Sequence, residues 1–471
     1  MDKERRKKIQ TARLIITEVF MLIIIILTVI TLTFIVMGYR LNEDGELEQS
    51  GLIQIDSLPT GATVAIDGET LDTKTNTSKI LPEGSYTVSI QKDGYTSWEK
   101  TVKTHPGLLT RLSYPSLYKL DRKTKDIKTF EETPYSFVAS PNRNNALIFF
   151  EKSPVAQLVD LGANDYKSTE IDLTKLLGDN FSDLKILDWN KNGERVIISF
   201  TKNDSTHYAV IDLTRPDSSL DISETFNLKI SALRFENNHG DKIFLVEEGH
   251  LRTISFNTKQ LSGIIAKDVE SFFNSNEKVA IVTKSTSGGH KISLYDDNTK
   301  STIFLKDSTA ENVYALVSEY IGRGTLAFLE DGQLSIYRGE LPSEDISSEK
   351  PLPTPVGQHE LDFQIPDTFE TQSYNQIILI SRDNKFTVFD LENYTFSPFT
   401  LENNLTFWPD EYTIGVVSDN KLIIRDFDGL NRLELGDSEN GLAAVITKNN
   451  KYLYHMQKKE NKITLIREEI R

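Results

Sequence analysis

Cysteine is absent from this chain of 471 residues, and histidine, methionine and tryptophan are scarce. The sequence contains 7 His, 4 Met and 3 Trp residues. Without cysteine the protein cannot form disulfides, use a thiol nucleophile or bind zinc through thiolates. A domain outside the cell would then depend on packing alone, which is more typical of a prokaryotic envelope protein than of a small secreted scaffold.

The histidines are scattered and form no motif for metal binding or catalysis. No H-E-x-x-H or similar paired-ligand spacing occurs among His105, His207, His239, His250, His290, His359 and His455. The segment from Ser285 to His290 (STSGGH) invites interpretation as a nucleophile loop, but it lacks G-x-S-x-G and is expected to be a hairpin turn. The sequence therefore predicts no catalytic, cofactor-binding or metal-ligating residue, and no cofactor.

One acidic turn has two interpretations. Asp426 and Asp428 flank Phe427 and precede Gly429, and closely spaced carboxylates can bind calcium. The later ligands of a calcium loop are missing, and Asp-Gly is a common turn, so a turn without an ion is favoured.

Hydrophobic residues are also few, at 38% of the chain, which favours many short, half-exposed strands. The net charge is -16, although residues 1–40 carry seven basic and three acidic residues. The remainder therefore carries -20 and would repel a phosphate backbone, so nucleic acid is not an expected partner. Solubility is a sufficient explanation of this charge.

One long apolar run is nevertheless present, and it begins at Val19 and ends at Met37. These 19 residues carry no charge. About 17–25 apolar residues are enough for a helix to cross a bilayer, so the run is expected to contact membrane lipid. Six basic residues precede it, which places the N-terminus in the cytoplasm and everything after Tyr39 outside the cell.

A cleaved signal peptide and a buried core helix are the alternatives to this anchor. A signal peptide has a shorter apolar region and a cleavage site with small residues. The run instead ends in Met37, Gly38, Tyr39 and Arg40, so an uncleaved, single-pass anchor in the cell membrane is favoured.

After the run, short alternating strands at 52–55, 63–66, 86–90, 99–102 and 108–112 are separated by Gly, Asp and Pro turns. This pattern predicts a small β-sandwich. Pro59-Thr60-Gly61-Ala62, Pro82-Glu83-Gly84 and Gly94-Tyr95 resemble the PEGA domain, with Thr60 in the second position of its namesake tetrapeptide. The resemblance implies a prokaryotic, surface-associated β-module without catalytic activity.

The remaining residues repeat a unit of apolar strand, polar turn and further strands, with the third strand often ending in Asp. Copies begin about 36 to 53 residues apart, near Phe137, Leu187, Leu233, Phe272, Leu316, Phe369, Phe407 and Ala443. That period is typical of a four-stranded propeller blade. The polar turns after Ser140, Trp189 and Trp408 resemble those of Tol-type and WD-like propellers, which implies a fold and no particular function.

The repeats predict a mainly β protein with a β-propeller of seven or eight blades, eight being favoured. The last copy lacks a fourth strand, which residues 119–130 are expected to supply. The proline-rich insertion 340–367 is expected to be a long extended loop between two blades. The expected organisation is a basic cytoplasmic tail (1–13), a transmembrane helix (14–38), a linker (39–50), a PEGA-like sandwich (51–113) and the propeller (114–471).

No motif for chemistry emerges, so binding without catalysis is the favoured function. Stacking on sugars is considered for Trp98, Trp189 and Trp408. Because Trp189 and Trp408 share one repeat position, packing between blades is favoured for these two. We expect the propeller to bind or scaffold a cell-envelope component: another envelope protein, a peptide or a neutral glycan. A glycan hydrolase with residues dispersed over blade loops and a sensor acting through a partner are the alternatives.

Overall fold

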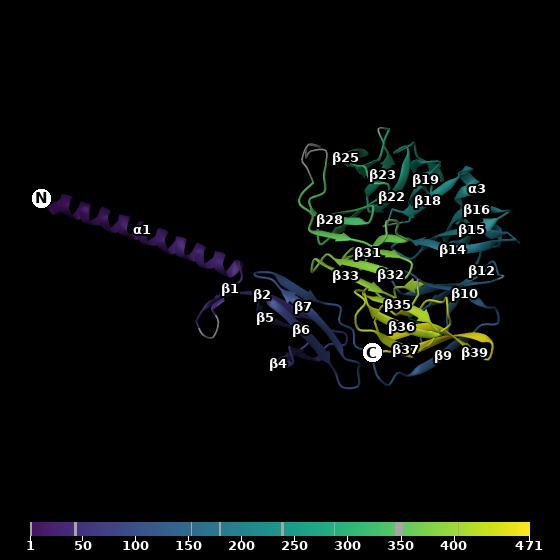
Figure 1. Cartoon of the computed structure of the whole chain (residues 1–471), viewed down its shortest axis with the longest axis horizontal. Coiled ribbons are helices and arrows are strands. Elements are labelled where there is room, and N and C mark those ends of the chain that lie inside the picture. Colours follow the sequence, from purple (N-terminus) through teal and green to yellow (C-terminus); the bar gives the residue numbers. More distant parts are fainter. Residues whose placement is uncertain are drawn as a thin grey trace. The chain divides into compact units, whose positions relative to one another are not determined.

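The computed structural model divides the chain into two compact units, Met1–Asp121 and Arg122–Arg471. It describes residues 2–41, 45–151, 153–178, 180–236, 240–286, 288–343, 352–403 and 405–471. Each unit is described by itself, from the N-terminus onward (Figure 1).

The apolar run lies in a single long helix, α1 (Asp2–Val36). Residues Arg13–Val36 form one helix long and apolar enough to cross a membrane. Their side chains are exposed rather than packed, which contradicts the alternative of a buried core helix. The predicted limits need correction, because helical backbone already begins at Asp2 within the expected tail and ends two residues before Gly38, whose φ is +83°.

The predicted linker 39–50 is wrong in its described part. β1 (Tyr39–Leu41) pairs antiparallel with β2 (Leu47–Ile55), with Tyr39 opposite Gln49. The amide of Ser50 also donates to the carbonyl oxygen of Gly38 at 2.8 Å. The polar composition hid this hairpin because Leu47 and Glu48 lie at the exposed end of β2, while residues 42–44 lie outside the described residues.

Two four-stranded sheets follow and confirm the predicted small β-sandwich. β2 pairs with β1, β5 (Thr77–Pro82) and, in parallel, β8 (Leu109–Leu112). The second sheet has the order β4 (Glu69–Lys74), β3 (Thr63–Ile66), β6 (Gly84–Gln91) and β7 (Trp98–Thr104). Alternate residues of these strands are buried, as a half-buried sheet requires, and they include Ile53, Val64, Val88 and Trp98.

Residues 114–121 belong to this first unit and not, as predicted, to the propeller. The ring of Tyr114 packs edge-on against Trp98, with 6.1 Å between ring centroids. Single β-bridges pair Ser116 with Leu58 and Lys119 with Tyr95. The continuous apolar spacing across Leu112 and Tyr114 gave no signal for this boundary.

The described part of the second unit contains eight four-stranded antiparallel sheets. The first four are β10 (Pro134–Ala139), β11 (Asn145–Phe150), β12 (Val155–Asp160) and β13 (Ser168–Asp172); β14 (Ser182–Trp189), β15 (Arg195–Lys202), β16 (Ser205–Asp212) and β17 (Leu220–Asp221); β18 (Ile230–Phe235), β19 (Lys242–Glu247), β20 (His250–Ser255) and β21 (Gln260–Leu261); and β22 (Val269–Ser275), β23 (Lys278–Lys284), β24 (His290–Asp296) and β25 (Ser301–Ser308).

The remaining four sheets continue in chain order until the last one. They are β26 (Val313–Tyr320), β27 (Arg323–Glu330), β28 (Gln333–Gly339) and β29 (Gly357–Glu360); β30 (Thr368–Gln372), β31 (Ile377–Arg382), β32 (Lys385–Asp390) and β33 (Thr395–Thr400); β34 (Thr406–Phe407), β35 (Thr413–Ser418), β36 (Lys421–Asp426) and β37 (Leu433–Asp437); and β38 (Val445–Ile446), β39 (Tyr452–Lys459), β40 (Lys462–Glu469) and β9 (Thr124–Thr129). Three short helices lie close to the second sheet in the sequence. α2 (Thr174–Leu177) precedes β14, η1 (Pro216–Ser218) lies between β16 and β17, and α3 (Ile222–Phe226) follows β17.

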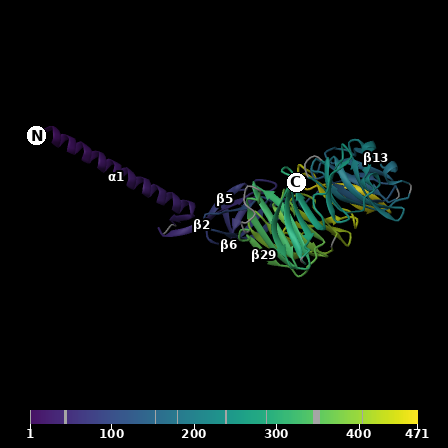
Figure 2. The same ribbon diagram turned by 90° about the horizontal axis from the view of Figure 1, so that it is seen from above.

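These sheets follow one another around a ring, which is the arrangement of a β-propeller (Figure 1). Figure 2 shows the strands of the β26–β29 sheet side by side. The second strands, such as β11 and β15, are buried on both faces because cores form between successive sheets. Fourth strands such as β9 and β33 are mostly exposed. These sheets therefore have a buried centre and a solvent-exposed outer edge, whereas the fourth strand of the second sheet, β17, is buried.

The predicted closure of the ring is confirmed. β9 pairs antiparallel with β40, with Thr129 opposite Thr464, so the last sheet combines the two ends of the unit. Phe130 extends this closure because it is buried and packs against Phe150 of the first sheet at 5.6 Å. The last and first sheets therefore pack through a hydrophobic core, as the other neighbouring sheets do.

The predicted long loop 340–367 is wrong in part. It contains β29, which pairs with β28 and completes the fifth sheet, with His359 opposite Leu334. Residues 344–351 lie outside the described residues. Proline concealed this strand because an edge strand tolerates proline close to its ends.

Candidate functional site

The structure places the described histidines apart from one another. They lie in different sheets or turns: His105 before β8, His207 on β16, His250 on β20, His290 on β24, His359 on β29 and His455 on β39. His239 lies outside the described residues. The segment from Ser285 to Gly289 joins β23 to β24 as a turn, apart from Ser287, which is not described. Its amide of Ser285 donates to Gly289 O at 3.0 Å, which confirms a hairpin.

One group in the described chain has the composition of a metal site, namely His207, Asp221 and Glu224. One ligand atom from each lies within 4.8 Å of the others. Their positions also have a local explanation, because Asp221 caps α3 by accepting the amide of Glu224 at 2.9 Å and contacts His207 Nδ1 at 2.7 Å. The Asp221 carboxylate therefore already serves the fold, and the Glu224 carboxylate pairs with Lys202 at 3.5 Å.

The acidic turn after β36 is also explained by its hydrogen bonds. Asp428 Oδ1 accepts the amide of Leu430 at 3.2 Å, and Asp426 Oδ2 accepts the side-chain amide of Asn431 at 2.8 Å. Asp212 and Asp390 end the equivalent third strands, and they likewise accept turn amides two residues later. The Asp that recurs at the end of the third strand is thus a turn-forming residue.

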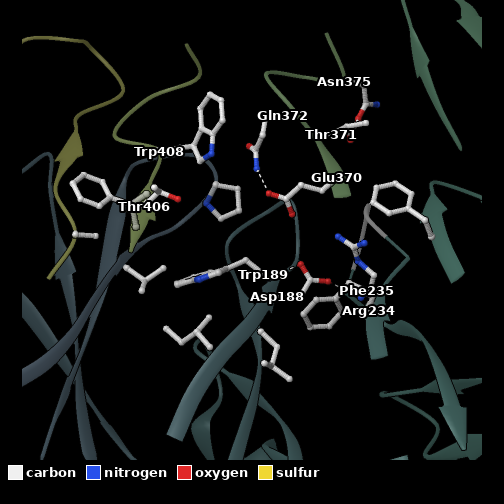
Figure 3. Close-up of a pocket in the computed structure, with 18 of the residues that line it drawn as sticks. Asp188, Trp189, Arg234, Phe235, Glu370, Thr371, Gln372, Asn375, Thr406 and Trp408 are labelled. Atoms are coloured by element: carbon white, nitrogen blue, oxygen red, sulfur yellow. Dashed lines mark hydrogen bonds between the residues drawn. The ribbon is translucent and has the colours of Figure 1, made fainter. Parts of the chain in front are cut away.

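A cavity of about 730 Å³ opens at the centre of the propeller. Its lining comes from the first strands of several sheets, or from the residues beside them, including β10, β14, β18, β22, β30 and β34. Cavities of this size are typical of small-molecule binding sites. Residues more than 200 positions apart in the chain, such as Asp188 and Trp408, therefore line one space (Figure 3).

Packing between blades is confirmed for Trp189, and the structure adds a second position, beside the cavity, for Trp189 and Trp408. Trp189 and Trp408 both line the cavity and are half-buried, whereas Trp98 is 1% exposed in the core of the first unit. Trp189 also packs against the core between the first two propeller sheets. Packing is therefore one of its roles, and a face toward the cavity is another.

A β-bulge places Asp188 at this cavity. The pairing of β14 with β15 shifts between Ile186 and Asp188, which leaves Leu187 as the extra residue. Leu187 is 45% exposed although it is apolar, and it too lines the cavity. A bulge turns the side chains of a strand, so this irregularity exposes both residues to the central space.

The Asp188 carboxylate is held by two backbone amides. Oδ1 accepts the amide of Trp189, and Oδ2 accepts the amide of Phe235 on the next sheet, both at 2.9 Å. Burial nevertheless raises the pKa of Asp188, against the lowering effects of Arg234 and of these two amides. The negative charge of Glu370 raises the pKa of Asp188 further, because it disfavours a second negative charge nearby.

Arg234 supplies the cavity's positive charge. Figure 3 shows its guanidinium group facing Asp188, and its central carbon lies 4.4 Å from the centre of the Phe273 ring. Asp188, Arg234 and Glu370 are the ionisable side chains among the described lining residues. The site thus has one cation and two carboxylates, one of which has a raised pKa.

Amides complete the polar lining. Gln372 Nε2 donates to Glu370 Oε1 at 2.6 Å, so the two side chains present one joined polar edge (Figure 3). Asn274 is 4% exposed, and its Nδ2 donates to Phe235 O at 2.7 Å. Its Oδ1 and the Trp189 Nε1–H are buried without a hydrogen-bond partner. Both atoms are enclosed by the protein, so the accessible polar groups of the cavity are those of Asp188, Arg234, Glu370 and Gln372.

Sequence reasoning missed Asp188, Arg234, Glu370 and Asn274. The available signal was a polar or charged residue on a first strand, close to its polar turn, in four different repeats. Read singly, each is an ordinary solvated residue. Only the ring brings them together.

The sequence of the first unit matches a known family. Residues 50–115 match the PEGA domain family. The first unit contains a PEGA domain. Thr60 in the namesake tetrapeptide therefore does not prevent the match. The matched region ends at residue 115, close to the predicted boundary at 113, and residues 116–121 complete the first unit. No curated protein is similar enough to the chain to give a match.

Several solved structures are similar to the larger part of the chain. The β-propeller domain of Cps50 (Swd1) from Myceliophteria thermophila is 8% identical, with 73% of this chain and 99% of that chain covered and a TM-score of 0.39. An oligogalacturonate lyase in complex with manganese is 9% identical, covering 74% of this chain and 98% of that one, also at 0.39. Because both TM-scores are below 0.5, we base the propeller on its own sheets and draw no function from these structures.

Proposed function

We propose that this protein is a membrane-anchored binding protein, and that its propeller binds a component of the cell envelope through the central cavity without catalysing a reaction. The supporting observation is the cavity itself, which combines two tryptophans, joined amide and carboxylate groups, and an arginine. Recognition sites commonly place polar groups beside apolar side chains, and in this cavity the polar groups form the larger part of the exposed lining.

The proposed location is the outer side of a cell membrane. The helix Arg13–Val36 would act as the anchor, and the basic residues before it favour a cytoplasmic N-terminus. Protease added to intact cells should then digest the PEGA domain and the propeller. Protection in intact cells together with cleavage in inverted vesicles would contradict this orientation.

The binding test uses the full chain in detergent and isolated envelope material from the same cells. We expect saturable retention, reduced strongly by the pair Trp408→Ala and Glu370→Gln in the cavity. The matched control is the pair Phe304→Ala and Glu311→Gln, because both residues are exposed on or beside the outer strand β25. Equal retention of the two double variants would refute a role for the cavity.

A glycan hydrolase is the second candidate, because Asp188 and Glu370 line the same cavity and Glu370 helps to raise the pKa of Asp188. Such enzymes use one protonated and one ionised carboxyl group. Both oxygens of Asp188 are, however, held by backbone amides, and the one from Phe235 joins β14 to β18, which favours a structural and binding role. Turnover of glycoside substrates that is lost in both Asp188→Asn and Glu370→Gln would establish the enzyme instead.

A further inference from the structure

The cavity's aromatic lining limits the ligand's chemistry. One face of Phe273 is already covered by Arg234, whose guanidinium carbon lies 4.4 Å from the ring centre. Trp189 and Trp408 are half-buried and line the cavity from two different sheets. A ligand with an apolar face could therefore stack on either indole.

The polar groups around the tryptophans are planar and carry both donors and acceptors. The Glu370–Gln372 pair offers a carboxylate beside an amide, held together at 2.6 Å. The guanidinium group of Arg234 adds a second planar group, which only donates. Such a lining suits a ligand that has several hydroxyl groups, because each hydroxyl both donates and accepts.

The charges of the lining disfavour a strongly charged ligand. Arg234 faces Asp188 and is thereby partly balanced (Figure 3). Glu370 would repel an anion, and Arg234 would repel a basic side chain that approached it. A neutral ligand meets neither penalty.

We infer that the central cavity binds a neutral oligosaccharide, with a sugar ring stacked on Trp408 and hydroxyl groups hydrogen-bonded to Glu370 and Gln372. The inference rests on the proposed function, since it names the ligand class of the same site. A sugar ring fits because its C–H face is apolar while its edge carries the hydroxyl groups. The outer portion's excess of negative charge agrees with a neutral glycan rather than an anionic polymer.

Intrinsic fluorescence gives a direct test, because the chain has 3 tryptophans and two of them line the cavity. Trp98 is 1% exposed in the other unit and provides a constant background. The full chain in detergent is titrated with tetrasaccharides of glucose and of N-acetylglucosamine, in parallel with tri-lysine and polygalacturonate fragments. We expect a change in tryptophan emission with at least one neutral sugar, at a dissociation constant below about 1 mM.

Variants assign the change to the cavity. Trp408→Ala should weaken sugar binding by about tenfold, which is the effect expected from losing an aromatic stacking contact. Gln372→Ala should weaken it without removing a fluorophore, and it serves as a second variant if Trp408→Ala does not fold. Phe304→Ala, at an aromatic residue that is 40% exposed on β25, should leave binding unchanged.

The outcomes separate this inference from the proposed function. If envelope retention depends on Trp408 and Glu370 but no neutral sugar binds, the ligand class is wrong and cavity binding stands. Binding of tri-lysine or of the acidic fragments in place of neutral sugars would overturn the ligand class in favour of a basic peptide or an anionic glycan. Loss of envelope retention as well as sugar binding would overturn both.

Discussion

The closure of the propeller by β9 and β40 can be trapped covalently. Thr129 and Thr464 are direct partners in the antiparallel register, and their hydroxyl oxygens lie 3.0 Å apart. Directly opposed residues of antiparallel strands have Cα atoms about 4.5–5.5 Å apart, within the range that disulfides accept. The double variant Thr129→Cys/Thr464→Cys should therefore form a disulfide in a chain that has no other cysteine.

The expected gain in stability follows from the separation of the two residues, which are 335 positions apart. The loop-entropy relation gives about 6 kcal/mol for a loop of that length, whereas disulfides typically contribute about 2–4 kcal/mol. The unit spans 122–471, and at about 2.1 cal/mol/K per residue its unfolding entropy is about 0.7 kcal/mol/K. The oxidised variant should therefore melt about 3–6 °C higher than its reduced form.

Calorimetry with and without reductant measures this difference, and a shift in mobility on a non-reducing gel reports the disulfide. The control pair is Thr129→Cys/Thr395→Cys, because Thr395 is exposed on β33 in another sheet. That pair should form no intramolecular disulfide. Equal cross-linking of both pairs, or none in Thr129→Cys/Thr464→Cys under oxidation, would refute the pairing of β9 with β40.

Three further predictions concern charge and the membrane. Arg195→Ala should cost about 3–5 kcal/mol in denaturant unfolding, because a buried guanidinium that binds Asp212, Gly240 O and Asn257 is lost, whereas exposed Arg432→Ala should cost less than about 1 kcal/mol. Burial, followed by Lys459, lowers the pKa of His455 to about 4, against the smaller raising effect of Asp437. As the pH falls, His455 therefore takes up a proton in the unfolded chain before it does so in the folded chain. The free energy of unfolding should keep its full value above about pH 6.5 and should fall by about 3 kcal/mol toward pH 4. His455→Gln should flatten this loss relative to wild type in the same unfolding assay, and an unchanged pH profile would contradict the assignment. The full chain should remain in membranes during a high-salt wash and require detergent for release, whereas release by salt alone would show that Arg13–Val36 is not an anchor.

Local sequence patterns predicted most of the fold, because the apolar and polar residues of each strand indicate which of its side chains are buried. The eight repeat starts, from Phe137 to Ala443, lie in or beside the first strands of the eight sheets. The recurring Asp residues, such as Asp212 and Asp390, were visible in sequence because a turn needs them locally. The boundary at Asp121 was not visible, because Tyr114 joins the first unit through a distant ring, that of Trp98.

The site could not be predicted in the same way. Asp188 and Glu370 lie on different sheets, and only closure of the ring brings both to one cavity. The bulge that exposes Asp188 is a pairing irregularity between β14 and β15, and no residue type marks it. Trp189 shows the same limit, since its sequence position fitted both packing and lining, and the structure gives it both.

The position of β9 also has a consequence for synthesis of the chain. In its partner β40 (Lys462–Glu469), Thr464 is synthesised 335 residues after Thr129, so the last sheet cannot form until β40 has left the ribosome. Until then Phe130 has no complete core to enter, and the strand remains an unpaired edge. A chain cut short by a nonsense codon would keep that edge open and offer it to proteases. The ring closure thus acts as a check that synthesis has reached β40.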